Sequence, residues 1–478
     1  MPRTTHESPS QKDSNAEDLL RSTDPKPELP GKFVTPIALG TILQPLNSSM
    51  IAVALVGIRS HFDAGTSVTW LVSALYLATA VAAPAMGRIA DVLGPRRTSL
   101  AGIVLVGATS AVAPFAPNVA TLVVCRILIG IGTAAQYPCG VAMIRRAADR
   151  LRSRPNNTLA ALAICSQVTA ALGPSLGGLL VGGFGWAGVF WINVPLAVFG
   201  GAVIMRWGPA DAPARGHSSG RLKSLARVDP VGMLLFAVSI TTLMFWLLSL
   251  AATPVWWWLA VAVPAVALTA WWGLRARDPF LDMRLLARGG LSLTYVRTIV
   301  TYTAFYCVFY GLPQWLEEAR GLGPVGTGLV VLPIAAVGAV STLLATRLQR
   351  KQGPRAALLV GTAALCVGGL LLTVPDAGSP ILLLLVVSAM LGLPNGFNNM
   401  GNQGAMYAAA PAERMGAASG LYRTSQYVGA NLAAALLALV IGGHADDAGL
   451  HRMGLAISII AGALLAASLF GLLRRRRA

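Results

Sequence analysis

Charged residues are scarce in this sequence of 478 residues. Asp, Glu, Lys and Arg together make up 12%, whereas hydrophobic residues make up 55%. Soluble domains carry about twice that charged fraction, so the composition excludes a soluble enzyme. Glycine and proline occur inside apolar runs without a regular period, which excludes a collagen-like chain and a disordered one. The composition therefore predicts a membrane protein with many spans.

Side chains that bind metals or start catalysis are also few. The five cysteines lie in apolar segments without metal-ligand spacing, and the five histidines lie in tails or loops. We therefore expect the cysteines to pack as small hydrophobic side chains. We expect no metal site and no cofactor, and the absence of a visible nucleophile–base pair argues against an enzyme.

Long apolar stretches dominate the sequence instead. Residues 1–32 are polar and of mixed charge, and are expected to form a disordered tail. Beyond them, apolar stretches of about 20 residues recur, each long enough to cross a bilayer as a helix. The fourteen predicted spans are at about 33–57, 69–88, 98–115, 119–143, 158–181, 187–206, 229–250, 255–274, 291–313, 326–345, 356–374, 380–408, 416–442 and 453–473.

These spans divide the chain into five predicted parts. They are a disordered cytoplasmic tail (1–32), a six-helix bundle (33–207), cytoplasmic linkers with two extra spans (208–290), a second six-helix bundle (291–473) and a basic cytoplasmic tail (474–478). The stretch at about 275–290 is expected to be an interfacial helix, because charged residues interleave there with apolar ones. Those charged residues are Asp278, Asp282, Arg284 and Arg288.

Basic residues are distributed unevenly over this map. The formal net charge is +18, and with the N-terminus inside, 32 of the 37 Lys and Arg residues fall in inner loops and tails, Arg423 among them. This asymmetry predicts a multi-pass protein of the cell membrane with both termini in the cytoplasm. It also accounts for the positive charge without nucleic acid, so the lipid bilayer is the expected partner.

Two loops of the chain resemble each other. Gly94-Pro95-Arg96 and Gly353-Pro354-Arg355 occur at the same offset after the second span of each six-span block. Such an internal repeat is typical of a transporter built from two halves around a central small-molecule site.

The first of these loops resembles the signature of the major facilitator superfamily, G-x-L-a-D-r-x-G-r-k. Its matching residues are Gly87, Asp91, Gly94 and Arg96, followed by Arg97, and it departs from the pattern at Val92. Asp91 is expected to cap a helix of the opposite half and to pair with Arg96 or Arg97, which would latch an inner gate. The alternative is that the glycines only form a turn and Asp91 is solvated.

Three further motifs follow in the order that this family has them. Arg126, Gly130 and Gly132 resemble the R-x-x-x-G-x-G pattern of proton-coupled members, and residues 190–195 resemble the start of span six in drug exporters. The G-P-x-x-G-G motif of antiporters is matched by Gly173, Pro174, Gly177 and Gly178. Together with the span count, they resemble the fourteen-span drug:proton antiporter branch, over nearly the whole chain past the tail.

This resemblance implies an all-α membrane protein with the major facilitator fold: two six-helix bundles and two extra central helices, fourteen transmembrane helices in all. It implies multidrug efflux by secondary transport, with the protein acting as an antiporter and protons as the coupling ion. The exported molecules would be drugs, antibiotics or secondary metabolites, which would link the protein to antibiotic resistance.

The sequence departs from this branch in its acidic residues. Asn47 stands where such exporters usually have an acidic residue, and none of the 19 Asp and Glu residues lies in the middle of a predicted span. A proton needs a titratable carrier, for which the remaining candidates are Asp91, Glu317 and Glu318. A uniporter or importer of an anionic or neutral metabolite without proton coupling is therefore the alternative, and a non-transporting sensor is a third.

One basic residue appears deep within a predicted span. Arg126 is expected to face the central cavity and to act in substrate or proton coupling, because a charge at that depth is costly. The alternative is a structural cation held by backbone carbonyl groups. With Arg126 interpreted as the only deep charge, an anionic substrate is favoured over a cationic one.

Neutral polar and aromatic side chains mark the expected substrate cavity. The asparagines of the twelfth span follow one helical stripe, and they form either a substrate-facing wall or hydrogen-bonded contacts between helices. A tyrosine stripe on the ninth span either lines the cavity or packs against neighbouring helices. The cavity residues are predicted to be Gln44, Asn47, Tyr302, Tyr306, Asn395, Asn398, Asn399, Asn402 and Gln426.

Overall fold

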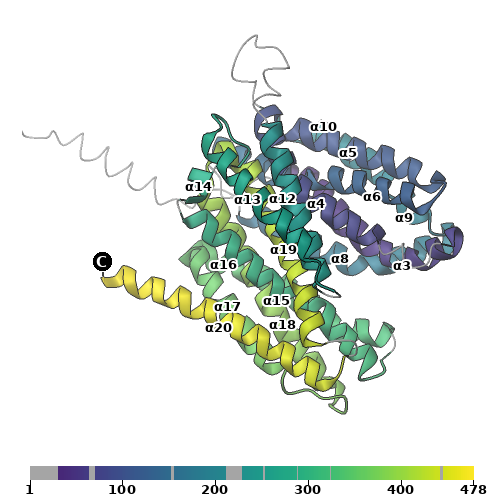
Figure 1. Cartoon of the computed structure of the whole chain (residues 1–478), viewed down its shortest axis with the longest axis vertical. Helices are drawn as coiled ribbons and strands as arrows, with labels where there is room; N and C mark the ends of the chain where they lie inside the picture. The colour runs from purple at the N-terminus through teal and green to yellow at the C-terminus, as the bar shows by residue number, and fades with distance from the viewer. Residues whose placement is uncertain are drawn as a thin grey trace, which may run out of the picture.

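The protein is described by a computed structural model over residues 31–63, 70–151, 156–211, 229–250, 253–281, 283–287, 289–322, 324–441 and 445–477. Within these ranges the regular secondary structure is helical, without strands. Figure 1 shows two helical bundles, one formed by the purple and blue N-terminal helices and the other by the green and yellow C-terminal ones. The predicted all-α fold is therefore confirmed.

The N-terminal bundle precedes the first extra helix. Its elements are α2 (Gly31–Thr41), α3 (Leu43–Phe62), α4 (Trp70–Leu93), α5 (Pro95–Val112), the 3-10 turn η2 (Ala113–Phe115), α6 (Val119–Ala134), α7 (Gln136–Leu151), α8 (Asn156–Phe184), α9 (Gly188–Trp191) and α10 (Asn193–Trp207).

The rest of the described chain contains the extra helices and the C-terminal bundle. Its elements are α12 (Pro230–Ser249), α13 (Trp256–Arg275), α14 (Met283–Ala287), α15 (Gly290–Glu318), α16 (Pro324–Gln352), α17 (Pro354–Leu371), α18 (Ile381–Ala409), the 3-10 turn η3 (Ala412–Arg414), α19 (Met415–Val440) and α20 (Asp447–Arg477).

Every predicted span coincides with one helix or with two consecutive helices. Ten helices of the described part are long and apolar enough to cross a membrane, or eleven if one bent pair in α2 and α3 counts as a span. The number fourteen therefore stays a prediction. The interfacial helix expected over 275–290 is wrong in extent, since the only helix described between α13 and α15 is Met283–Ala287 and residues 276–281 are irregular. Asp282 and Arg288 lie outside the described residues.

Prolines explain three of the breaks within predicted spans. The second helix of each broken pair has proline as its third residue, because a proline in the first turn has no N–H to leave unpaired. These prolines are Pro45 in α3, Pro138 in α7 and Pro195 in α10. Polar residues precede them at the breaks, among them Gln44, Tyr137 and Asn193.

The internal repeat has the same backbone in both halves. Gly94 has φ = 107° before Pro95, the first residue of α5, and Gly353 has φ = 80° before Pro354, the first residue of α17. Only glycine adopts such angles without strain, and proline is suited to the first helical position. The two Gly-Pro-Arg loops therefore turn the chain between the second and third spans of each bundle in the same way.

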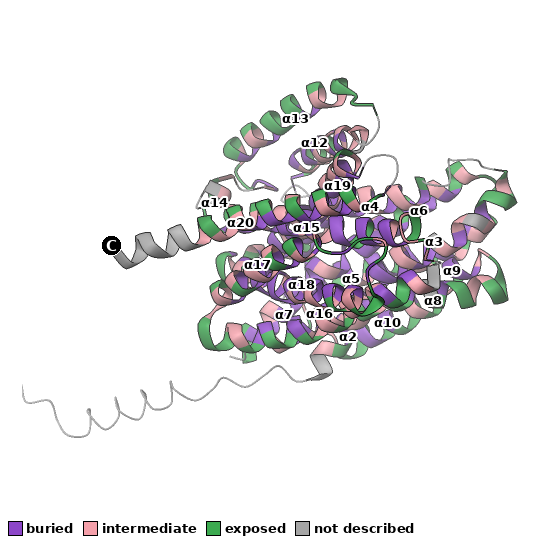
Figure 2. Cartoon of the chain, turned by 90° about the horizontal axis from the view of Figure 1, so that it is seen from below, coloured by how far each residue is buried: buried purple, intermediate pink, exposed green. Residues whose placement is uncertain are grey.

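Apolar side chains cover the outside of the molecule as well as its core. Leu179 of α8 is 76% exposed and Ile459 of α20 is 71% exposed. Exposed apolar residues on long helices are expected where the solvent is lipid. Figure 2 shows many exposed residues along α13, whereas buried residues concentrate between the two bundles and within them.

The two bundles are joined mainly at one end, which we call the arginine-rich end after Arg88, Arg145, Arg146 and Arg414. There a single apolar cluster contains residues of both bundles, from Ile37 to Tyr422. Toward the opposite end each bundle has a cluster of its own, which contains no buried member from the other. The bundles are thus closed together at the arginine-rich end and separate at the other.

The extra helices cover the seam between the bundles. Met244 and Leu247 of α12 pack against Ala80 of α4 and against Tyr427 and Val428 of α19. Helix α13 packs on α12 (Figure 2). Helix α12 therefore contacts both bundles where α4 and α19 meet.

Candidate substrate site and gate

The closest approach of the two bundles is between α4 and α19. A Cβ atom on Gly87 would lie 2.1 Å from the Gly416 oxygen, and one on Gly416 would lie 2.3 Å from the Gly87 oxygen. Only residues without a side chain allow two backbones to approach this closely. Gly87 of the signature loop is thus required for closure of the arginine-rich end.

Asp91 binds the opposite bundle, one helical turn beyond Gly87. Its two carboxylate oxygens accept hydrogen bonds from the backbone N–H groups of Gly416 and Ala417, both at 2.9 Å. These groups begin α19, where backbone N–H groups have no partner within the helix and where the helix dipole favours a negative charge. Asp91 therefore caps a helix of the other bundle and links the two.

The arginines expected to pair with Asp91 bind elsewhere. The backbone N–H groups of Arg96 and Arg97 donate to the Asp211 carboxylate at 3.0 and 3.1 Å, and the Arg96 guanidinium donates to the Met205 carbonyl. Asp211 therefore caps α5 and attaches the end of α10 to it. The signature arginines stabilise the N-terminal bundle in this conformation.

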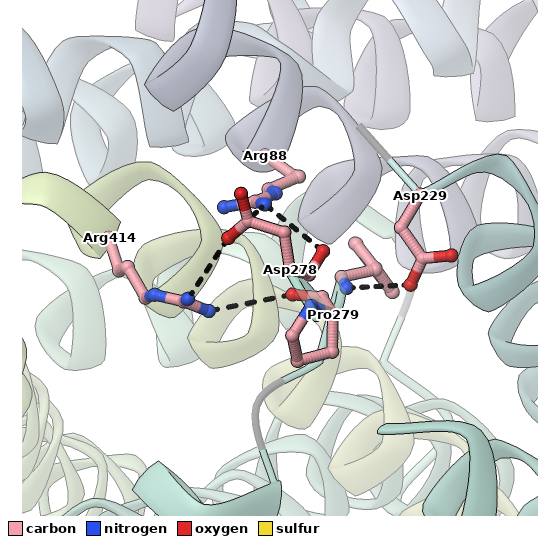
Figure 3. Close-up of polar contacts among 6 residues, drawn as sticks. Arg88, Asp229, Asp278, Pro279 and Arg414 are labelled. Atoms are coloured by element: carbon pink, nitrogen blue, oxygen red, sulfur yellow. Dashed lines mark hydrogen bonds and ion pairs between the residues drawn. The ribbon is translucent and has the colours of Figure 1, made fainter. Parts of the chain in front are cut away.

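A second contact between the bundles passes through the irregular segment after α13 (Figure 3). The Asp278 carboxylate lies 3.4 Å from the Arg88 guanidinium of α4 and 3.6 Å from that of Arg414, beside α19. Asp229 holds this segment by accepting the Phe280 N–H at 2.8 Å. The segment that follows the extra helices therefore bridges α4 and the start of α19.

Arg126 is fully enclosed in the N-terminal bundle. Its side chain is 1% exposed and donates to the backbone oxygens of Leu71 at 2.9 Å and Asn47 at 3.3 Å. Gly130, one turn further along α6, packs against α4, where an added Cβ would lie 2.9 Å from the Leu75 oxygen. In this conformation Arg126 has the environment of the structural alternative, a cation held by carbonyl groups.

Asn47 also lies inside the N-terminal bundle. Its side-chain amide exchanges two hydrogen bonds with that of Asn193 of α10, at 2.8 and 2.9 Å, and both residues are buried. Asn47, which stands where exporters usually have an acidic residue, thus links α3 to α10 through its side-chain amide. Asn193 belongs to the motif at residues 190–195, but that motif does not predict its pairing with Asn47.

The antiporter motif places α8 against α3. A Cβ atom on Gly173 would lie 1.7 Å from the Ser49 hydroxyl oxygen, and one on Gly177 would lie 3.0 Å from the Met50 oxygen. Gly178, by contrast, faces open space. The side chain of Pro174 lies outside the described residues.

The centre between the bundles contains an arginine that lies deeper than the predicted span boundary indicates. Arg423 lies about two turns into α19. Its guanidinium donates to Gln44 of the N-terminal bundle and, at 2.6 Å, to Gln426 of its own helix. It also lies over the rings of Tyr137 and Tyr427, with 5.5 and 5.4 Å to their centroids. Arg126 is therefore not the only deep charge.

Hydrogen bonds and stacked rings extend this central group toward α18. Tyr137 of α7 accepts a hydrogen bond from Gln403 at 2.6 Å and stacks on Tyr422, with 6.3 Å between ring centroids. Tyr422 and Tyr302 both donate to the Asn399 side chain, at 3.4 and 3.2 Å. The predicted cavity residues Gln44, Tyr302, Asn399 and Gln426 thus belong to one polar and aromatic group.

A cavity lies beside this group in the C-terminal bundle. It is small in this conformation, with a volume of about 30 Å³. Asn395, Asn398 and Asn399 line it, whereas Asn402 donates to Thr301 at 3.0 Å and is buried. The asparagine stripe therefore serves both as cavity wall and as a contact between helices.

The tyrosine stripe forms the aromatic side of the same region. Tyr302 lines the cavity together with Phe305 and Phe309, whereas Tyr306 packs between these rings and Tyr310. Among the described residues no group of His, Cys, Asp or Glu is arranged to hold a metal. Ring faces and carboxamides suit an aromatic organic molecule.

Comparison with known proteins gives one family. The sequence pattern of the Major Facilitator Superfamily matches residues 37–434. An uncharacterised MFS-type transporter, YwoD of Bacillus subtilis, is 32% identical over 91% of this chain and 95% of its own length. The tetracenomycin C resistance and export protein of Streptomyces glaucescens is 28% identical over 86% of this chain and 76% of its own.

Further comparisons agree with these. The multidrug resistance protein Stp of Mycobacterium tuberculosis is 28% identical over 84% of this chain and 74% of its own. Among solved structures, the human organic anion transporter MFSD10 is similar in fold, with a TM-score of 0.63, 17% sequence identity and coverage of 90% of this chain and 99% of its own.

Proposed function

Because the chain belongs to the major facilitator superfamily, and is thus a multi-pass membrane transporter rather than an enzyme, we propose that it exports small organic molecules by alternating access. The observation that carries this proposal is the position of Arg423. Its guanidinium joins both bundles at a polar and aromatic group, while the arginine-rich end is closed beside it. A site between two halves with one closed end is what alternating access requires.

The contacts between α4 and α19 are the proposed gate. Asp91 binds two N–H groups of the opposite bundle, and Asp278 bridges Arg88 and Arg414. When the end opens, these polar groups can exchange their partners for water, while the apolar cluster shared by both bundles separates. Closure then needs the same partners to meet again, which gives a gate with two defined states.

The arginine-rich end is proposed to face the cytoplasm. Basic residues are retained on that side of a membrane, and both termini would then be cytoplasmic. In this orientation the present structure is closed to the cytoplasm and represents the state from which a substrate leaves.

Export of antibiotics or other drugs is supported by the relatives. Two of them carry names that state resistance to tetracenomycin C and to multiple drugs, at 28% identity each. The Gly173 and Gly177 contacts with α3 supply the close packing that the antiporter resemblance implies. Export is therefore favoured over the importer alternative.

Proton coupling is the less supported part of this function. Asp91 is one of the carboxylates of the proposed gate, and Glu318 accepts the Ala445 N–H at the far end of α15. In the described residues no acidic side chain contacts the Arg423 group. Transport without protons is therefore the second candidate.

The test uses inverted membrane vesicles with and without the protein. We expect accumulation of at least one compound from a panel of lipophilic cations, neutral antibiotics and organic anions, because uptake into inverted vesicles corresponds to export. Proton release on addition of that compound would establish antiport. If no compound of the panel accumulates beyond the level of vesicles without the protein, the export function is wrong.

A further inference from the structure

We propose that Arg423 binds the negatively charged group of the transported molecule, so that this protein exports organic anions and moves their charge outward with them. The proposal rests on the export function and specifies its substrate class and driving force. It follows from the place of Arg423, its partners and the absence of a counter-charge beside it.

The described partners of Arg423 are uncharged. Its guanidinium donates to the side-chain oxygens of Gln44 and Gln426, and it lies 5.5 and 5.4 Å from the ring centroids of Tyr137 and Tyr427. In the described part of the chain no carboxylate forms an ion pair with it. An arginine stays protonated, so its positive charge is held here by dipoles and ring faces alone.

The described surroundings of the Arg423 guanidinium therefore contain no anion to balance its charge. A buried cation without a counter-ion is costly, and an anion that displaces the two amide oxygens would form stronger, charge-assisted hydrogen bonds. The planar guanidinium fits a carboxylate or sulfonate with two parallel bonds. Arg423 also keeps part of its surface accessible, whereas Gln44 and Gln426 are buried.

The other deep arginines show what a structural role looks like. Arg126 binds backbone oxygens within the N-terminal bundle. Arg297 binds Thr362 at 2.7 Å and Ser468 at 2.9 Å within the C-terminal bundle. In the ranges that the structure describes, neither forms a hydrogen bond to the other bundle, whereas Arg423 of α19 donates to Gln44 of α3. An anion at Arg423 would therefore compete directly with a contact that closes the bundles together.

Aromatic groups beside Arg423 indicate the rest of the ligand. Tyr137 and Tyr427 flank the guanidinium, and Tyr302 and Phe305 continue along the cavity wall. Ring faces of this kind stack on aromatic molecules. The expected ligand is therefore an aromatic or amphipathic carboxylate or sulfonate.

The charge of the ligand supplies the driving force. Cells hold a potential that is negative inside, so an anion moving outward with its charge is driven by that potential alone. No proton carrier is then needed, which agrees with the uncharged surroundings of Arg423. A potential-driven exporter of anions combines export with the uniport alternative.

The experiment uses the full-length protein in liposomes without a pH gradient. A potential is set with potassium and valinomycin, and three labelled probes are compared: benzylpenicillin as an aromatic anion, chloramphenicol as a neutral molecule and ethidium as a cation. We expect benzylpenicillin to enter liposomes that are positive inside. The direction of its flux should reverse when the potential is reversed, and an imposed pH gradient should leave the flux unchanged.

Variants assign this flux to Arg423. Arg423→Gln is expected to lower benzylpenicillin flux at least tenfold, and Arg423→Lys to restore part of it because the charge returns. Arg59→Gln, which changes an exposed arginine outside the site, is the matched control. Arg423→Gln is expected to keep a cooperative thermal unfolding transition, which shows that it is folded. Benzylpenicillin should raise the unfolding temperature of the parent protein and leave that of Arg423→Gln unchanged, which shows that the variant does not bind.

The outcomes separate this proposal from the export function. If ethidium or chloramphenicol is transported and benzylpenicillin is not, export stands and the anion assignment is wrong. If benzylpenicillin flux follows the pH gradient instead of the potential, or is unchanged in Arg423→Gln, the assignment is also wrong. If none of the three probes moves, the export function itself fails and this proposal with it.

Discussion

At the scale of single residues, hydrogen bonds to backbone groups do much of what charge pairs would do in a soluble protein. Arg126 is held by two carbonyl oxygens and Asp91 by two N–H groups. In lipid every polar group needs such a partner within the protein. Side chains of one charge can therefore be buried without partners of the other.

The amide pair of Asn47 and Asn193 gives a prediction at this scale. Asn47→Leu alone leaves a buried amide unpaired, which should lower the stability of the N-terminal bundle by about 1–3 kcal/mol. The double variant Asn47→Leu, Asn193→Leu should lose less than the two single variants together, because no amide is left unpaired. Thermal unfolding of the three purified variants measures this. Additive losses would contradict the pairing.

Asp91 gives the second prediction. Asp91→Asn removes the charge that the start of α19 attracts and one of two acceptors, which weakens closure by about 1.5–3 kcal/mol. We expect the arginine-rich end to open more often, measured as faster labelling by a water-soluble thiol reagent of a cysteine placed at Ala417. Asp446→Asn, which removes an exposed pair with Arg452 at the opposite end, is the control. Equal labelling rates in both variants would rule out the latch.

The sequence predicts the structural role of a residue well where that role depends only on its neighbours in the chain. Asp91 next to glycines and the proline-marked breaks follow from short-range geometry. Arg423 was counted with the inner loops because it lies near the start of its span, and its depth depends on how α19 is positioned against α4. The spacing of Arg423, Gln426 and Tyr427 was the available signal, since residues three and four apart share one helix face.

At the scale of elements, the packing of α4 on α19 determines whether the arginine-rich end can close. Gly87, Gly416 and Gly420 lie in this contact, and an added Cβ at any of them would lie within 2.5 Å of a backbone atom. Backbone atoms cannot move aside as flexible side chains do. The contact is therefore closed completely or not at all.

Gly416→Ala tests this packing. The added methyl group would meet the Gly87 oxygen, so we expect the closed state to be lost and transport to fall by more than tenfold while the helices remain folded. Transport in proteoliposomes and the circular dichroism of the purified variant are the measurements. Gly462→Ala in α20, where an added Cβ meets nothing within 4 Å, is the matched control. Normal transport by Gly416→Ala would contradict the gate.

Helix positions could be predicted from apolar runs, but the segment after α13 could not. Charged residues interleaved with apolar ones suggested one helix over 275–290, whereas Asp278 instead bridges two arginines far apart in the sequence. Local periodicity contains no information about such partners. Similarly, α12 covers the α4–α19 seam, and its sequence shows only that it is apolar.

At the scale of the whole molecule, the superfamily was predictable, because its motifs occur in the expected order along the chain. Which end is closed was not. That follows from an apolar cluster shared by both bundles at the arginine-rich end and from separate clusters beyond it. The central claim is that the bundles rock about the Arg423 site.

This motion can be measured with spin labels at the two ends of the molecule. One pair of labels is placed at Arg150 of α7 and Gln352 of α16, at the arginine-rich end. The other pair is placed at Ser60 of α3 and Arg452 of α20, at the opposite end. All four positions are exposed. They would be introduced as cysteines after replacement of the five native ones.

Pulsed electron resonance distances with and without benzylpenicillin give the decisive result. The account predicts that the anion lengthens one distance and shortens the other in the parent protein, and changes neither in Arg423→Gln. If both distances move in the same direction, or if the variant responds like the parent, rocking about an anion at Arg423 is contradicted.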